Sequence, residues 1–148
     1  MACGIAGLVS GCATHDQSAA RDSGTEGDGM LVVYSAYAVN ADFNRRDAER
    51  PEYSGYNIYQ ADGRLWQFIR NSSDTIVQGP QPVELPAGNY RIVARVNGHG
   101  LETIPVNIES RRKTILHLDG KASPAGAQAD AVHSTDGQVM GWQTVAGL

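Results

Sequence analysis

The fold is decided by residues 85–108, LPAGNYRIVARVNGHGLETIPVNI. From Tyr90 to Val96, apolar residues alternate with arginines, and from Leu101 to Glu109 the alternation resumes with isoleucine and valine. Strict alternation is typical of a β-strand with one buried face. Between the two runs, Asn97-Gly98-His99-Gly100 has the composition of a turn. The stretch therefore predicts two neighbouring strands, and in each of them every second side chain faces a core.

Further strand-like runs lie on both sides of this stretch. They are Met30–Ala38, Tyr56–Gln60, Arg64–Arg70, Gln81–Glu84 and Thr114–Leu118. Asp62-Gly63 is a strong hairpin turn signal between two of them. About seven short strands without a long helical pattern favour two packed sheets, because one open sheet would leave an apolar face in water. We expect an all-β protein with a single seven-stranded antiparallel β-sandwich at residues 29–119, and a small barrel is the alternative.

The run from Val83 to Leu118 also resembles a known group of domains. Its pattern is a Leu-Pro-x-Gly-x-Tyr turn, an outgoing strand, a glycine turn and a returning strand. This pattern is similar to the carboxypeptidase regulatory-like and PEGA group of prealbumin-type sandwiches. The resemblance implies a non-catalytic module with an accessory, adhesion or stabilising role, and it supplies no catalytic residues.

The N-terminus has the order of a processed and anchored segment. Residues 1–11 are apolar and small, like a signal peptide, and Leu8-Val9-Ser10-Gly11-Cys12 resembles the lipobox of bacterial lipoproteins. That resemblance implies cleavage before Cys12 and a lipid on its thiol. Residues 12–28 are then a lipidated cysteine and a disordered, flexible tether, rich in Ser, Gly, Asp and Ala. We expect a lipoprotein of the bacterial cell envelope, facing the periplasm or the exterior, held to the membrane by this anchor.

Composition narrows the function classes. The formal net charge of −4 argues against nucleic acid as the main partner. No apolar run reaches the 18 or more residues of a membrane-spanning helix. The only cysteines are Cys3 and Cys12, so the predicted domain contains no disulfide and depends on its core for stability.

Residues capable of catalysis or metal binding are scattered. The histidines, His15, His99, His117 and His133, have no partner at zinc-ligand spacing, and we expect each to be a surface residue. No nucleophile motif, phosphate loop or metal motif occurs. Asn71-Ser72-Ser73 fits a glycosylation sequon, to which we give no meaning in a bacterial protein. We expect no enzyme, no metal and no cofactor.

The longest connection within the predicted domain, residues 40–54, is the candidate binding loop. It places aromatic rings beside arginines, the usual anchors of binding surfaces: Phe43, Arg45, Arg46, Arg50 and Tyr53. The alternative is that Phe43 and Tyr53 cover the open edge of the sandwich. Asp42–Glu49 fits a short helix with i,i+4 ion pairs better than a calcium loop.

The C-terminal region follows a linker at residues 120–130. Residues 131–148 form a tail with a hairpin signal at Asp136-Gly137. A lone hairpin is barely stable in water, so the tail should dock. Trp142 is its candidate docking anchor, either on the sandwich edge or on a partner.

These expectations combine into one hypothesis of function. The chain would be a non-enzymatic, lipid-anchored β-sandwich that binds or scaffolds at the cell envelope. The first alternative is a glycan-binding module of the envelope. The second is a small hydrolase whose site arises from Ser and Asp residues that meet only in the folded chain. The partners would be the membrane and an envelope protein or glycan.

Overall fold

The computed structural model describes residues 27–39, 51–71, 79–123 and 129–148, and in these segments the chain is all β. The strands are β1 (Gly29–Tyr34), β2 (Tyr37–Val39), β3 (Pro51–Tyr53), β4 (Tyr56–Gln60), β5 (Leu65–Ile69), β6 (Val83–Leu85), β7 (Gly88–Val96), β8 (Gly100–Ile108), β9 (Arg112–His117), β10 (Ala129–His133) and β11 (Val139–Gly147). No helix in these segments is long and apolar enough to cross a membrane.

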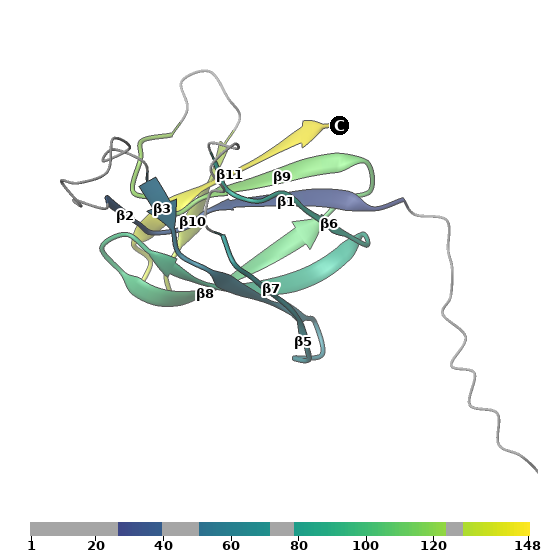
Figure 1. The fold of residues 1–148 in the computed structure, drawn as a ribbon, viewed down its shortest axis with the longest axis horizontal. Helices are drawn as coiled ribbons and strands as arrows, with labels where there is room; N and C mark the ends of the chain where they lie inside the picture. Colours follow the sequence, from purple (N-terminus) through teal and green to yellow (C-terminus); the bar gives the residue numbers. More distant parts are fainter. Residues whose placement is uncertain (1–26, 40–50, 72–78, 124–128) are drawn as a thin grey trace, which may run out of the picture.

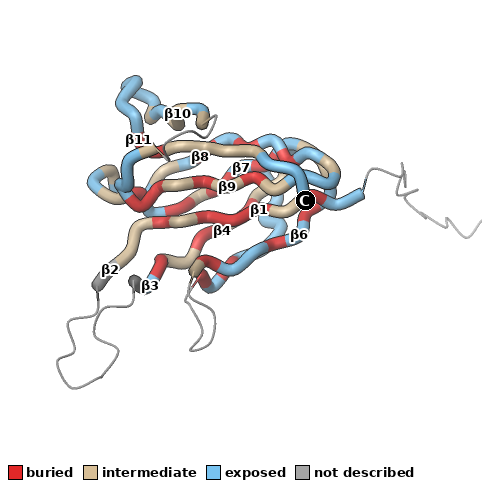
Figure 2. The backbone as a smooth tube through the Cα atoms, turned by 90° about the horizontal axis from the view of Figure 1, so that it is seen from above, coloured by how far each residue is buried: buried red, intermediate tan, exposed pale blue. Residues whose placement is uncertain are grey.

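Two larger sheets form the two layers of a sandwich-like fold. One has five strands in the order β10-β11-β9-β1-β6, and the other has four in the order β5-β4-β7-β8. Figure 1 shows the first layer above the second, with the short pair β2-β3 at the end of the sandwich opposite to the start of β1. The buried stretches follow the inner faces of β1, β4, β7 and β9, whereas β10 has only half-buried and exposed residues (Figure 2).

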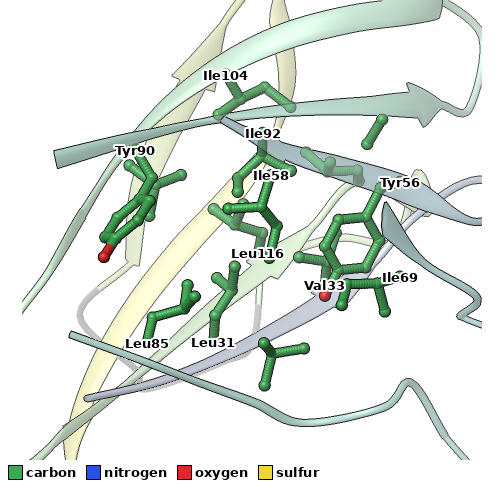
Figure 3. Close-up of a cluster of buried hydrophobic side chains, with 14 of the residues drawn as sticks. Leu31, Val33, Tyr56, Ile58, Ile69, Leu85, Tyr90, Ile92, Ile104 and Leu116 are labelled. Atoms are coloured by element: carbon green, nitrogen blue, oxygen red, sulfur yellow. The ribbon is translucent and has the colours of Figure 1, made fainter. Parts of the chain in front are cut away.

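The predicted alternation in residues 85–108 is confirmed. In β7, Tyr90, Ile92, Ala94 and Val96 are at most 7% exposed, and the residues between them are exposed or half-buried. In β8 the inward residues are Ile104, Val106 and Ile108. These side chains meet Leu31, Leu85 and Leu116 from the five-stranded sheet, so one apolar core lies between the layers (Figure 3).

The structure differs from the seven antiparallel strands expected. The described residues form eleven strands, and β1 runs parallel to β9, with Met30 opposite Lys113 and Tyr34 opposite His117. Only β6, on the other side of β1, is antiparallel to it. An apolar run such as Leu31–Val33 predicts a buried strand, but apolarity does not encode the direction of its neighbour. That direction is set by tertiary packing.

The predicted strand Met30–Ala38 is interrupted at Ser35. After Tyr34 the chain leaves β9, and the amide of Ala36 donates a hydrogen bond to the carbonyl of Arg95 on β7, 2.8 Å away. The segment therefore passes from one layer to the other. Ser35 is fully buried there, and its hydroxyl donates to the carbonyl of Ser54 at 2.7 Å.

The side chain of Asn71 stabilises the segment that passes from one layer to the other. This side chain is fully buried, and its amide nitrogen donates to the Val33 carbonyl at 2.8 Å and to the Ser35 hydroxyl at 3.1 Å. Its amide oxygen accepts from the backbone of Gln81 at 3.2 Å. The asparagine of the sequon pattern is thus a buried structural residue, which leaves it inaccessible to modification in the folded chain.

The C-terminal segment is part of the five-stranded sheet. β10 and β11 pair as an antiparallel hairpin whose turn places Gly137 at φ +83°. β11 pairs along its length with β9, from Trp142 opposite His117 to Gly147 opposite Arg112. Met140 is 5% exposed and belongs to the core cluster, and Val132 packs against that cluster.

Several expectations concern residues outside those that the structure describes. They are the signal-peptide-like segment 1–11, the lipidation site Cys12, nearly all of the tether 12–28, the helix or calcium loop at Asp42–Glu49, and part of the linker 120–130. They remain predictions.

Candidate functional site

Aromatic rings gather at the end of the sandwich where β1 stops and β2 and β3 begin. Tyr34 stacks on His117 with ring centroids 4.6 Å apart and planes 11° from parallel. Tyr53 meets Tyr34 edge-on at 5.5 Å and Tyr37 at 6.1 Å. We call these four residues the tyrosine cluster. The sequence brings them together through the turn of the chain at Ser35 and the antiparallel pairing of Tyr37 with Tyr53.

An ion pair lies against the tyrosine cluster. The Asp119 side chain is fully buried, and its Oδ2 lies 3.3 Å from the Nζ of Lys121, whose side chain is 58% exposed. Among the residues that the structure describes, neither carboxylate oxygen has a hydrogen-bond partner of good geometry, so the contact with Lys121 is an ion pair without an aligned hydrogen bond. The same ammonium lies 5.8 Å from the ring centroid of Tyr37, within range of a cation–π contact.

The backbone around Asp119 is held firmly. The side chain of Asn97, in the turn between β7 and β8, donates to the Asp119 carbonyl at 2.7 Å, and the Asn97 amide donates to the Leu118 carbonyl at 3.0 Å. The following residue, Gly120, has φ +77°, a conformation that favours glycine. The carboxylate therefore has a defined position in the fold.

The charges of this site act on one another. Burial lowers the pKa of His117; the Asp119 carboxylate opposes this effect and Lys121 adds to it. Burial raises the pKa of Tyr53, and the Lys121 ammonium opposes that rise. The contact with Asp119 raises the pKa of Lys121, which keeps its ammonium charged at neutral pH. The Lys121 ammonium thus lies beside both the Asp119 side chain and the ring of Tyr37, and the raised pKa of Tyr53 keeps that hydroxyl uncharged at neutral pH.

The structure places two of the residues predicted to bind. Tyr53 is 6% exposed and packs among the rings at the end of the sandwich. Trp142 is half-buried on β11, opposite His117 on β9. The other residues of the candidate loop, Phe43, Arg45, Arg46 and Arg50, lie outside the described residues.

A second surface lies at the edge of the four-stranded sheet. β5 is the terminal strand of that sheet, and four of its five residues are exposed. Three of them are large and apolar: Leu65 is 56% exposed, Trp66 43% and Phe68 56%. We call these residues and the free side of their strand the β5 edge. The sequence predicted the strand, but no signal in it indicated that this strand would be the terminal one of its sheet among the described residues.

A hollow of about 300 Å³ lies beside the turn between β4 and β5. Its walls include Gln60, Asn89 and Tyr90, and its charged residues are Asp62 and Arg64, exposed and joined at 2.7 Å. Hydrogen bonds from the Arg64 backbone lower the pKa of the Asp62 carboxyl. A carboxyl of that kind is ionised at neutral pH and is poorly suited to donate a proton to a substrate.

The His, Cys, Asp and Glu side chains of the described segments are the possible metal ligands. No group of three or more His, Cys, Asp or Glu side chains that could hold a metal ion occurs in the segments that the structure describes. Of the histidines expected at the surface, His133 is exposed, His99 is half-buried in a turn, and His117 is half-buried beneath Tyr34.

Comparisons of the chain with protein families, with curated proteins and with solved structures found no match.

Proposed function

We propose that this protein is a non-enzymatic binding or scaffolding module of the bacterial cell envelope, anchored through Cys12, and that it binds an extended segment of an envelope protein at the β5 edge. The observation that supports the binding surface is the exposed apolar strand itself. Of the six large apolar side chains most exposed on the described residues, three are Leu65, Trp66 and Phe68. The anchor rests on the lipobox-like Leu8–Cys12.

The chemistry of the β5 edge favours a polypeptide strand as the occupant. A terminal strand offers backbone N–H and C=O groups on its free side, and proteins normally protect such an edge with charges, prolines or a covering segment. β5 has apolar side chains where that protection is expected. A partner strand would satisfy the backbone groups and bury the rings at once, which is the arrangement of β-augmentation.

The position of the chain ends agrees with this arrangement. β1 begins at Gly29, at one end of the sandwich (Figure 1). The proposed anchor, Cys12, precedes this strand in the chain. A module held in this way can present the β5 edge to neighbouring envelope proteins.

The test compares variants of exposed apolar residues in the whole chain. Replacing Trp66 and Phe68 together by serine should abolish recovery of the envelope partner after crosslinking in cells, with the unfolding free energy changed by less than about 1 kcal/mol, because both rings are exposed. Leu101→Ser is the matched control, since Leu101 is 66% exposed on the same sheet, and it should keep the partner.

Amide hydrogen exchange decides how the partner binds. In the complex, the amides of Leu65–Ile69 should exchange at least about tenfold more slowly than in the free protein, as expected for backbone groups newly paired in a sheet. Unchanged exchange across β5 with the partner bound would refute the proposed edge. Recovery of cell-wall polysaccharide rather than protein, lost in the Trp66/Phe68 variant, would favour the glycan-binding alternative instead.

A further inference from the structure

The inference concerns the Asp119–Lys121 ion pair, which lies away from the β5 edge and has no role in the proposed function. Asp119 has a fully buried carboxylate whose two oxygens have no well-aligned hydrogen bond within the described segments of the chain. Burial of a carboxylate without an opposite charge or hydrogen bonds strongly disfavours folding, so a neighbouring cation is needed to stabilise it. In this structure the cation is the ammonium of Lys121.

The ion pair joins a fully buried carboxylate to a lysine whose side chain is largely exposed, which is an uncommon combination. The side chain of Lys121 is 58% exposed, and this residue belongs to the segment that leaves the sandwich after β9 rather than to a strand. The ammonium reaches Asp119 from the solvent side and passes beside the ring of Tyr37. The fixed half of the pair is therefore the carboxylate, and the half able to leave is the lysine.

The fixed part has the chemistry of a site for organic cations. A carboxylate supplies the charge, and tyrosine faces attract a cation within about 6 Å of the ring centroid. Tyr37 provides such a face, and Tyr53 packs against Tyr37 and holds it in place at 6.1 Å. The Asn97 side chain donates to the backbone carbonyl of Asp119 and so holds the backbone that carries the carboxylate, a contact that does not involve the bound cation.

We propose that Asp119 and the ring of Tyr37 form a binding site for the ammonium of a lysine side chain from a ligand outside this chain, and that Lys121 fills this site in the free protein. The group already seated there identifies the ligand class, because an external lysine reproduces its charge and its alkyl chain. Lys121 acts as a tethered competitor, present at an effective concentration of roughly millimolar or above. An external lysine must displace it.

The experiment removes the competitor. The probe is Nα-acetyl-lysine N-methylamide, titrated into the whole chain while the NMR signals of Tyr37 and Tyr53 are followed. Lys121→Ala should bind the probe about tenfold or more tightly than the unaltered protein, as expected when a tethered competitor is lost. Lys113→Ala, which alters the only other lysine of the chain, is the matched control and should bind the probe like the unaltered protein.

Two further measurements make the result decisive. The norleucine analogue of the probe, which lacks the ammonium, should not bind Lys121→Ala, and adding Asp119→Asn should abolish binding of the lysine probe. If the double variant does not fold, Lys121→Ala with Tyr37→Leu replaces it and should weaken binding severalfold through loss of the cation–π contact. The proposal is overturned if Lys121→Ala binds the probe no more tightly than the unaltered protein, or if binding survives both Asp119→Asn and Tyr37→Leu.

Discussion

Asn71 shows how one polar side chain can hold together the end of a sandwich. Its amide group makes hydrogen bonds to β1, to the crossing at Ser35 and to the segment that enters β6. Gln81 is far in the sequence from Val33 and Ser35, and the buried Val33 carbonyl would lose this hydrogen bond without Asn71. The chain thus changes layers at a point where buried polar groups are paired by the hydrogen bonds among Ser35, Ser54 and Asn71.

Replacement of this asparagine should be costly. Asn71→Ala should lower the free energy of unfolding by about 2–3 kcal/mol, because the buried groups that it contacts lose their partner. Urea denaturation measures the loss. Asn107→Ala is the control: Asn107 donates to Asn89 at 2.9 Å on the exposed face, and its loss should cost less than about 0.5 kcal/mol. Equal losses for the two variants would contradict the structural role assigned to Asn71.

His117 should make stability depend on pH. Burial holds its pKa in the folded chain below the value of 6.5 that it has in the unfolded chain. The unfolded state therefore binds more protons, so this contribution is fully present above pH 6.5 and is lost as the pH falls through the lower folded-state pKa. Denaturation at a series of pH values should show stability falling below pH 6.5.

Variants separate this effect from that of the carboxylates. His117→Phe keeps an aromatic ring for Tyr34 to stack on but cannot titrate, so its stability should fall less steeply below pH 6.5. His133→Gln alters an exposed histidine and should keep the slope of the unaltered protein. An unchanged slope in His117→Phe would show that this histidine does not couple to folding.

At the scale of single residues, the sequence predicted what depends on alternation. It correctly placed Ile92 and Val106 in the core, since strand periodicity alone determines their face. It could not bring Tyr34 to His117 or Lys121 to Asp119, because those contacts depend on which strands become neighbours. The burial of Asp119 has no local signal at all.

At the scale of elements, the C-terminal hairpin extends a sheet that would otherwise end at β9. β11 pairs with β9 over six residues, from Trp142 to Gly147. Met140 adds its side chain to the core, and Trp142 lies half-buried opposite His117. A strand so placed covers an edge that would otherwise be open to other chains.

Removal of the hairpin should therefore destabilise the domain. A chain ending at Ser123 keeps Asp119 and Lys121 but lacks β10 and β11, and it should lose more than about 1 kcal/mol of unfolding free energy through loss of Met140 and Trp142 from packed positions. Removal of Leu148 alone, which is 66% exposed, is the control and should have little effect. Unchanged stability with loss of a bound partner would instead identify Trp142 as a partner anchor.

Element boundaries were largely predictable, and element partners were not. β4 has the bounds expected from Tyr56–Gln60, and β7 begins two residues before the predicted Tyr90. The break after Tyr34 was missed because the single polar residue Ser35 stands in an otherwise apolar run, and only the hydrogen bond from Ala36 to Arg95 reveals the change of layer.

At the scale of the whole molecule, β1 connects the two ends of the sandwich. β1 starts at the end next to the N-terminal segment and stops at Tyr34, at the opposite end (Figure 1). The Asp119–Lys121 pair follows β9, whose His117 is opposite Tyr34, so this pair and the tyrosine cluster lie at the end of the sandwich where β1 stops.

The anchor itself is tested by partition between detergent and water. If the proposed lipid is present, Cys12→Ser should move the protein from the detergent phase to the aqueous phase, because acyl chains on this cysteine would contribute about 0.8 kcal/mol per buried CH₂. Cys3→Ser, which alters the only other cysteine, should leave the protein in the detergent phase. Finding the unaltered protein in the aqueous phase with Met1 as its first residue would contradict the lipoprotein hypothesis.

The parallel pairing of β1 with β9 also determines when the protein can fold. β1 is made first, yet its neighbours in the sheet, β6 and β9, are made much later. Until Arg112–His117 has emerged from the ribosome, the central strand of the five-stranded sheet lacks the neighbour that runs parallel to it along its length. Pairing between such distant segments is slow, because a long loop must close before any contact forms. Completion of the five-stranded sheet therefore waits until Arg112–His117 has been synthesised, whereas β4, β5, β7 and β8 of the other sheet are already present by then.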